Sequence, residues 1–232
     1  DNVLEDARRI TQASSLPLLV DIDTGWEEQD GGIANAIKSM IAAGVGAVHV
    51  EDQVSAKRCG HRPNKQLVSL TAMQDRIKAA SDGRTDDSFV IMARTDALAS
   101  EGMDSAIERA TAYVEAGADM IFFEAATSID DYATFCAAVA VPVLANCTEF
   151  GKTPIIDRTQ LAEAGVAMVL YPLTAFRAMS HAAQTVYQTL IEQGTQNSLL
   201  DRMQPRDQLY QHLDYESFEQ QQDTQHQGEH NE

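Results

Sequence analysis

One cysteine in this chain is surrounded by residues that would make its thiol reactive. The segment Lys57-Arg58-Cys59-Gly60-His61 follows the apolar run 47–50 and the acidic pair Glu51-Asp52. Positive charge near a thiol favours its thiolate form and makes it useful as an acid, a base or a nucleophile. A lone cysteine is more commonly a small buried hydrophobic residue. The pattern therefore leaves two interpretations of Cys59, a chemical site or ordinary packing.

Carboxylates mark a second candidate site. Asp21 and Asp23 end the apolar run 16–20, where strand periodicity would place them on one side of the chain. Glu51 ends the next apolar run in the same way. Hard oxygen ligands of this kind, with water in the remaining positions, suit Mg²⁺ or Mn²⁺. We therefore predict a site for Mg²⁺, with Mn²⁺ as a second candidate.

Three arginines are candidates for binding an anionic substrate. Arg94 follows an apolar run, whereas Arg177 and Arg206 lie later in the chain. A guanidinium binds a carboxylate through two parallel hydrogen bonds, which suits a substrate with several carboxylates. Arg94 is the strongest candidate because it ends an expected strand. Arg206 taken alone is as well explained by an ordinary surface ion pair.

The elements that would position these residues alternate along the chain. Six short apolar runs, each ending in polar residues, are separated by amphipathic helices between residues 16 and 172. Strands that are apolar on both faces and alternate with helices belong to a parallel sheet covered by helices. In a (β/α)₈ barrel the chemistry lies at the carboxyl ends of the strands, where the candidate residues stand. We predict an α/β fold, a (β/α)₈ TIM-type barrel, rather than a doubly wound sheet.

The predicted barrel is two units short of the eight that closure needs, and an open barrel would expose unpaired strand edges. We expect a segment of about 60 residues, two strand–helix units of ~30 residues each, to be missing before residue 1.

Beyond residue 179 the pattern is purely helical. We predict one barrel domain with a C-terminal helical extension over residues 1–218, and a disordered acidic, Gln-rich tail over residues 219–232.

Composition excludes several classes of partner. The formal net charge of −18 disfavours nucleic acid and anionic membranes as partners. No apolar run reaches the roughly 18 residues that a membrane span requires, and the first residues lack the features of a signal peptide. Three widely spaced cysteines indicate reduced thiols of a cytoplasmic protein rather than a disulfide framework.

The residues around Cys59 resemble those of a known family. Glu51-Asp52-Gln53, followed by Lys57-Arg58-Cys59-Gly60-His61-Arg62-Pro63-Asn64-Lys65, is similar to the loop of the isocitrate lyase and phosphoenolpyruvate mutase superfamily, and specifically of its 2-methylisocitrate lyase branch. The segment Asp21-Ile22-Asp23-Thr24-Gly25-Trp26 also resembles that superfamily, whereas Glu27 to Gly32 departs from it. The resemblance covers residues 1–214 and favours a chemical role for Cys59.

The resemblance also implies a role for each candidate residue. Asp21 would bind the metal directly, Asp23 would lie beside it, and Glu51 would act mostly through water. Cys59 would be the catalytic acid, with His61 and Lys57 tuning the thiol and helping to bind a carboxylate. The substrate-binding residues would be Cys59, Gly60, Arg94, Glu124, Asn146, Thr148, Arg177 and Arg206. The expected assembly is a homotetramer that exchanges C-terminal helices between subunits.

The implied activity is a Mg²⁺-dependent carbon–carbon lyase that cleaves 2-methylisocitrate to pyruvate and succinate, in the methylcitrate cycle of propionate catabolism. Removal of a proton from the tertiary hydroxyl would start the cleavage. Arginines would hold the carboxylate that stabilises the succinate carbanion, and Cys59 would protonate that carbanion. The sequence does not identify the base.

Three alternatives remain open. Isocitrate lyase proper uses the same cysteine, but Arg58 and the segment 62–65 favour the methylated substrate. A decarboxylase or hydrolase that acts on oxaloacetate-like acids is disfavoured, because those relatives lack this cysteine. The non-enzyme alternative is an inactive barrel fragment or a binding protein, which gives no reason to retain a reactive thiol.

Overall fold

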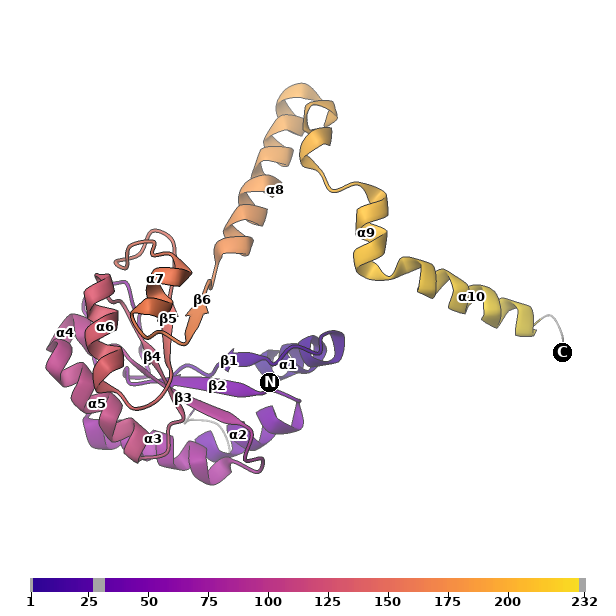
Figure 1. Cartoon of the computed structure of the whole chain (residues 1–232). Coiled ribbons are helices and arrows are strands. Elements are labelled where there is room, and N and C mark those ends of the chain that lie inside the picture. Colours follow the sequence, from indigo (N-terminus) through magenta and orange to yellow (C-terminus); the bar gives the residue numbers. More distant parts are fainter. Residues whose placement is uncertain (1, 27–31, 230–232) are drawn as a thin grey trace. The chain divides into compact units, whose positions relative to one another are not determined.

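The protein is described by a computed structural model that covers residues 2–26 and 32–229 (Figure 1). The chain divides into two compact units, Asp1–Thr174 and Ala175–Glu232, and each is described by itself. Residues 27–31, most of the loop that departs from the family pattern, lie outside the described residues. In the described part of the chain, no helix is long and apolar enough to cross a membrane.

The first unit is built on one curved parallel sheet. Its six described strands are hydrogen-bonded in sequence order, so each strand lies beside the next one in the chain. The strands are β1 (Leu19–Asp21), β2 (Ala47–Glu51), β3 (Val90–Thr95), β4 (Met120–Phe123), β5 (Val143–Asn146) and β6 (Met168–Leu170). This order requires a crossover after every strand, which the helices provide. The predicted α/β class with a parallel sheet is confirmed.

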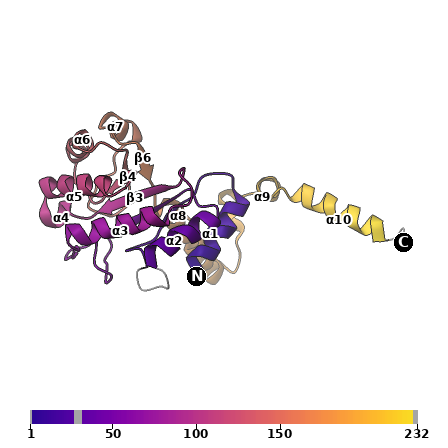
Figure 2. The ribbon, with the colours of Figure 1, turned by 90° about the horizontal axis from the view of Figure 1, so that it is seen from below.

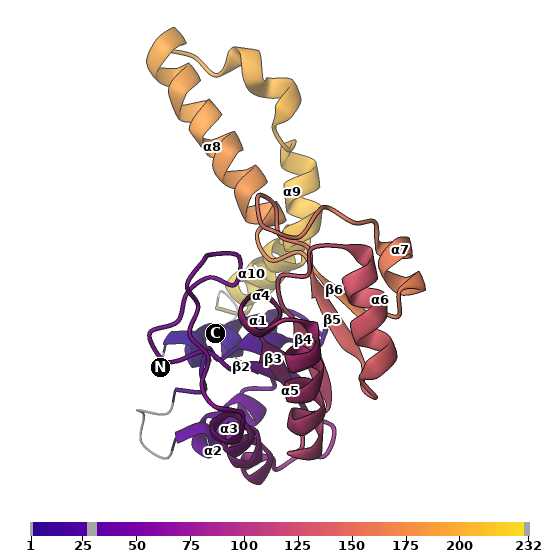
Figure 3. The ribbon, with the colours of Figure 1, turned by 90° about the vertical axis from the view of Figure 1, so that its left-hand side faces the viewer.

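Helices cover the outer face of this sheet. Figures 2 and 3 show α2, α3, α5 and α6 along the same side of the strands, and α1 lies against α2. The helices of this unit are α1 (Asn2–Ala13), α2 (Gly32–Ala42), α3 (Leu70–Gly83), α4 (Leu98–Glu101), α5 (Met103–Glu115), α6 (Ile129–Ala138) and α7 (Arg158–Glu163). Capping fixes where α6 and α7 begin, because Ser128 and Asp157 each form a capping box with the third helical residue.

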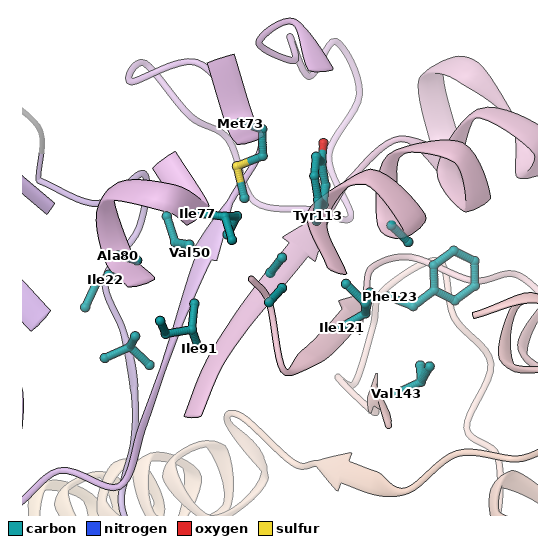
Figure 4. Packing of buried hydrophobic residues seen from close by; sticks show 14 of the residues in the cluster. Ile22, Val50, Met73, Ile77, Ala80, Ile91, Tyr113, Ile121, Phe123 and Val143 are labelled. Carbon is teal, nitrogen blue, oxygen red and sulfur yellow. The ribbon is translucent and has the colours of Figure 1, made fainter. Parts of the chain in front are cut away.

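The main hydrophobic core lies between the sheet and these helices (Figure 4). Met73 and Ile77 of α3, Tyr113 of α5 and Ile91 of β3 are fully buried in one cluster. Phe123 of β4 stacks on Phe135 of α6, with ring centroids 3.9 Å apart. Burial of each such side chain contributes roughly 1.5–3 kcal/mol, so this interface holds the strands in place.

Alternate residues of the strands face the other way, into the concave side of the sheet. Met92, Phe122 and Leu144 form a separate buried cluster there. Two residues further along the same strands come Arg94, Glu124 and Asn146, which by strand alternation share that side. The concave side is therefore apolar at its floor and charged at the carboxyl ends of the strands, which is where a barrel places its chemistry.

Asp52 lies on the other side of the sheet, as the alternation of side chains along a strand requires. It follows Glu51 but points toward the helices, where it is fully buried. Its carboxylate accepts hydrogen bonds from the Thr95 hydroxyl (2.8 Å), the Asp96 amide (2.9 Å) and the Tyr113 hydroxyl (2.9 Å). Asp52 thus joins β2, β3 and α5 and lies outside the candidate site.

The second unit is helical. It contains α8 (Thr174–Gln193), the 3₁₀-helix η1 (Asn197–Arg202), α9 (Arg206–Leu213) and α10 (Tyr215–Glu229), drawn from orange to yellow in Figure 1. Leu199 is buried beside Val186 and Met203. The composition predicts disorder from residue 219, but residues 219–229 belong to α10, consistent with the good helix propensity of Gln and Glu. Residues 230–232 lie outside the described part, and a domain boundary at residue 218 stays a prediction.

The close packing of α3 on α2 can be tested by a substitution at Gly83. A β-carbon at this position would lie 2.4 Å from the Ala34 carbonyl oxygen and 2.7 Å from the Ala34 Cα. Because these are backbone atoms, Gly83→Ala should destabilise the protein by about 1–3 kcal/mol despite the better helix propensity of Ala. Chemical denaturation measures the change. Gly46→Ala is the control, since its β-carbon would meet nothing closer than 3.5 Å. Equal stabilities for the two variants would contradict the close packing.

Candidate active site

Three predicted metal-binding carboxylates lie around one lysine ammonium. The Lys57 Nζ contacts Asp23, and lies 3.6 Å from Glu51 Oε2 and 4.0 Å from Asp21 Oδ2. Burial would lower the pKa of Lys57, but Asp23, Asp21 and Glu51 outweigh it and raise that pKa above its usual value. Lys57 therefore acts as the internal cation of this cluster.

The geometry of Asp21 and Asp23 differs from the predicted one. β1 ends at Asp21, and Asp23 has a left-handed backbone with φ of 54°. The Asp23 amide donates a 2.8 Å hydrogen bond to the Asp21 carboxylate, which closes a tight turn. The two carboxylates therefore meet at Lys57 through a turn, and strand periodicity is not the reason.

Glu51 is the buried acid of the cluster. It is 1% exposed, and within the described residues neither of its carboxylate oxygens has a hydrogen-bond partner. Burial raises the pKa of Glu51 to about 7, although Arg94 and Lys57 oppose the shift. Among the described residues, no three Asp, Glu, His or Cys side chains are gathered closely enough to hold a metal ion as they lie. Lys57 takes the position between them.

Arg94 is the cation of a second cluster. Its guanidinium pairs with Asp96 (2.9 Å) and lies 3.4 Å from both Glu51 and Glu124. The guanidinium carbon stands 4.9 Å from the centre of the Phe122 ring. Burial would lower the pKa of Arg94, but Glu124, Asp96 and Glu51 outweigh it and raise that pKa. Arg94 thus links the two clusters through Glu51.

The loop that contains Cys59 (residues 57–65, the cysteine loop) approaches Arg94 and Glu124 closely at Gly60. A β-carbon at Gly60 would lie 2.4 Å from Glu124 Cγ and 2.6 Å from Arg94 Nη2. Only glycine permits this approach, so the position of Gly60 explains its residue type. Cys59, next to it, is exposed. The loop therefore presents an accessible thiol beside a buried ion pair.

His61 enters from the same loop and faces Glu124. Its Nε2 lies 3.0 Å from Glu124 Oε1, while its Nδ1 accepts a 2.9 Å hydrogen bond from the Lys152 amide. Nδ1 is thus occupied as an acceptor, and Nε2 lies at ion-pairing distance from Glu124 without the geometry of a hydrogen bond. Burial would raise the pKa of Glu124, but His61 and Arg94 outweigh it and lower that pKa. Glu124 is accordingly ionised.

The remaining predicted residues divide between the two units. Asn146 Nδ2 donates a 3.3 Å hydrogen bond to Glu124, and Thr148 is buried just beyond the same strand. Arg177 lies on α8 and Arg206 begins α9, so both belong to the second unit. The structure brings together the predicted residues of the first unit and does not place the two arginines of the second unit relative to them.

Sequence reasoning assigned no role to Gln53, Lys65 and Asp96, all of which contact the site. Lys65 Nζ lies 2.6 Å from Asp96, and Gln53 hydrogen-bonds the backbone of Arg58. Asp96 follows Arg94 by two residues, the spacing that puts both side chains on one side of an extended chain. That spacing is the signal that could have identified Asp96.

Comparison with known proteins identifies the family. Residues 1–191 match the family model described as phosphoenolpyruvate phosphomutase. The chain belongs to this family. It is 57% identical over 224 residues to 2-methylisocitrate lyase of Escherichia coli (strain K12), a match that spans 97% of this chain and 76% of that protein.

Solved structures of the family agree with the fold. A crystal structure of 2,3-dimethylmalate lyase superposes with a TM-score of 0.82 at 31% identity, covering 90% of this chain and 70% of that one. Phosphonopyruvate hydrolase, in complex with oxalate and Mg²⁺, superposes with a TM-score of 0.80 at 27% identity, covering 93% of this chain and 75% of that one. The superpositions thus cover most of the chain.

The raised pKa of Glu51, about 7, makes stability depend on pH. A raised folded-state pKa means that the folded protein holds the Glu51 proton more tightly than the unfolded chain does. The resulting contribution to the free energy of unfolding is fully present below pH 4.5, the ordinary pKa, and is lost as pH rises through 7. With chelator present, the stability of wild type relative to Glu51→Gln should fall by up to ~3 kcal/mol between about pH 4.5 and 7.5. Guanidinium unfolding at a series of pH values measures this. A difference that stays constant with pH would rule out the shift.

Proposed function

We propose that this chain is a carbon–carbon lyase that cleaves 2-methylisocitrate to pyruvate and succinate. The observation that carries the proposal is the close approach of Gly60, the neighbour of the exposed Cys59, to the Arg94–Glu124 pair, whose cation suits a carboxylate. The 57% identity to a 2-methylisocitrate lyase supports this choice of substrate. A place in the methylcitrate cycle, which the family resemblance implies, is part of the proposal.

Asp21, Asp23 and Glu51 fit a hard divalent cation. They are oxygen donors that surround a positive charge already, and the buried Glu51 oxygens make no hydrogen bond within the described chain. A metal ion at this point would replace the Lys57 ammonium. When bound, Mg²⁺ would supply the charge that polarises the hydroxyl and carboxylate oxygens of the substrate. Mn²⁺ prefers the same donors.

The residues of the Arg94 cluster would bind the rest of the substrate. Arg94 offers its guanidinium to a carboxylate, and Asn146 and Thr148 line the same side of the sheet. Arg177 and Arg206 are proposed to bind a further carboxylate from the helical unit. Polar groups that are already oriented at the developing charge stabilise a carbanion whose electrons spread into a carboxylate.

Cys59 would complete the reaction as the general acid. A base takes the proton of the tertiary hydroxyl, the carbon–carbon bond breaks, and its electron pair passes to the succinate carbon while the hydroxyl carbon becomes the ketone of pyruvate. The thiol then gives its proton to the succinate carbon and is left as a thiolate. His61, whose Nε2 lies 3.0 Å from Glu124, is placed to orient the loop that carries the thiol.

Replacing the thiol by a hydroxyl tests this role. Cys59→Ser keeps the size of the side chain but replaces a thiol with a far weaker acid, so turnover should fall by roughly 10²-fold or more. KM should change little, because the arginines remain in place. Steady-state kinetics measure both. Near-wild-type turnover in Cys59→Ser would mean that another group delivers the proton.

The substrate itself is tested by comparing three acids with one preparation of the protein. Pyruvate and succinate should form from 2-methylisocitrate faster than any product forms from isocitrate or oxaloacetate. Faster cleavage of isocitrate would favour isocitrate lyase. Turnover of oxaloacetate alone would favour the decarboxylase or hydrolase alternative, and no turnover of any acid would favour the inactive-protein alternative.

The metal site predicts opposite effects for two substitutions. Lys57→Met removes the cation that competes for the carboxylates, so Mg²⁺ should bind more tightly, by about 10-fold or more for one displaced charge. Asp21→Ala should abolish Mg²⁺ binding and leave the fold intact, since Asp21 is exposed. Isothermal titration calorimetry measures both without turnover. Unchanged Mg²⁺ affinity in both variants would remove this cluster as the metal site.

Three wider features are also proposed rather than shown. The six-stranded sheet is proposed to be part of an eight-stranded barrel with two further strand–helix units. The assembly is proposed to be a homotetramer with exchanged C-terminal helices, consistent with exposed Phe176, Met179, Tyr187 and Ile191 on α8. A cytoplasmic location is proposed from the reduced cysteines.

A further inference from the structure

Two buried polar side chains lie beneath the cysteine loop and take no part in the proposed reaction. Gln53 is 1% exposed and Asp96 is fully buried. Gln53 follows β2 and Asp96 follows β3, and because these strands pair in parallel their carboxyl ends lie side by side. The two residues therefore occupy neighbouring positions under residues 57–65, the cysteine loop.

Gln53 binds the loop through the backbone of the residue before Cys59. Its Oε1 accepts a 3.0 Å hydrogen bond from the Arg58 amide, and its Nε2 donates a 2.8 Å hydrogen bond to the Arg58 carbonyl oxygen. One side-chain amide thus satisfies both backbone groups of a single residue, as a neighbouring strand would. This arrangement fixes the peptide on the amino side of Cys59.

Asp96 binds the far end of the same loop. Its Oδ1 lies 2.6 Å from Lys65 Nζ, with both side chains 2% exposed or less. The Nε2 of Gln53 also reaches Asp96 Oδ2 at 3.4 Å, so the two anchors are in contact. Just outside the loop, Gln53 and Leu67 form an antiparallel bridge that closes its base.

The same carboxylate orients Arg94. Arg94 Nε donates to Asp96 Oδ2 at 2.9 Å, and Nη2 donates to Oδ1 at 3.3 Å. Burial would raise the pKa of Asp96, but Arg94 and Lys65 outweigh it and lower that pKa. The ionised Asp96 thus holds one cation of the loop and one cation of the site. Such buried ion pairs contribute less to stability than to a defined geometry.

We propose that Gln53 and Asp96 are positioning residues that clamp the cysteine loop over the site and couple the placement of Cys59 to that of Arg94. The proposal deepens the proposed function and rests on it for the role of Cys59. The clamp itself is a property of the loop and can be measured without turnover.

Limited proteolysis with trypsin tests the clamp directly, because the loop offers Lys57 and Arg58 as cleavage sites, whereas Pro63 protects the bond after Arg62. Gln53→Met removes both hydrogen bonds to Arg58 at nearly constant volume. Cleavage within the loop should become at least about 10-fold faster, since cleavage follows the population of the open loop. Lys65→Met should have the same effect from the other end and serves if Gln53→Met does not fold. Gln74→Met, which removes a 3.4 Å hydrogen bond to Ala112 outside the loop, is the matched control.

Kinetics distinguish positioning from a merely structural role. In Gln53→Met, kcat for 2-methylisocitrate should fall by roughly 10-fold or more while KM stays within about 3-fold, because Arg94 keeps its carboxylate partners. Asp96→Asn should lower kcat and raise KM together, because it frees both the loop and Arg94.

Unchanged loop cleavage in both Gln53→Met and Lys65→Met would overturn the clamp. Equal effects in Gln74→Met would also overturn it, since they would indicate a general loss of stability. If wild type does not cleave 2-methylisocitrate, the proposed function fails, and the cleavage pattern still decides whether the loop is clamped.

Discussion

The arrangement of the candidate site depends on one buried guanidinium, that of Arg94, which neutralises several buried carboxylates. Arg94 is the cation that Glu51, Asp96 and Glu124 share, and each of them is almost completely buried. A buried charge without a partner is costly, and removal of one member of such a group exposes the others to that cost. The positions of Glu51 in one cluster and Glu124 in the other therefore both depend on Arg94. The strand register supports this arrangement, because Glu51 pairs directly with Arg94 across β2 and β3.

The cysteine loop packs against the same group of buried charged side chains. Gly60 lies against Arg94 and Glu124, His61 faces Glu124, and Lys65 pairs with Asp96. Lys57 at the start of the loop contacts the carboxylates at the ends of β1 and β2. Three points of the loop are thus held by charge, and the thiol between them remains accessible. A proton donor needs this combination of fixed position and access to the substrate.

The strand ends could be predicted from the sequence because each apolar run stops at polar residues, and parallel strands bring such ends together. Asp21, Glu51, Arg94, Glu124 and Asn146 were found in this way or through the family resemblance. Charge pairing was harder to predict, because it depends on distance across the sheet and not along the chain. Lys57, for example, lies among the carboxylates, and its role in tuning the thiol stays a prediction. The anchoring contacts of Gln53 could not be predicted, because a buried amide has no periodic pattern of its own, whereas the spacing of Asp96 from Arg94 does carry a signal.

The helical end of the chain was less predictable for a different reason. The segment after residue 219 has few apolar residues, which indicates disorder, yet it forms part of α10 because helix propensity does not require burial. Arg177 and Arg206 show a related limit. Their residue type suits carboxylate binding, but their contribution to a site depends on how a separate helical unit is placed, which local sequence does not encode.

The dependence of the site on Arg94 can be measured by following the carboxyl groups. With chelator present, ¹³C NMR titration of Glu side chains should show Glu124 with a pKa below its ordinary value in wild type, as it should for Glu101, whose partner is Arg109. In Arg94→Gln the pKa of Glu124 should rise by about 1 unit or more, since an adjacent cation has been removed, while Arg94→Lys should retain part of the shift. An unchanged Glu124 titration in Arg94→Gln would contradict the account, because the carboxylate would then be held by other groups.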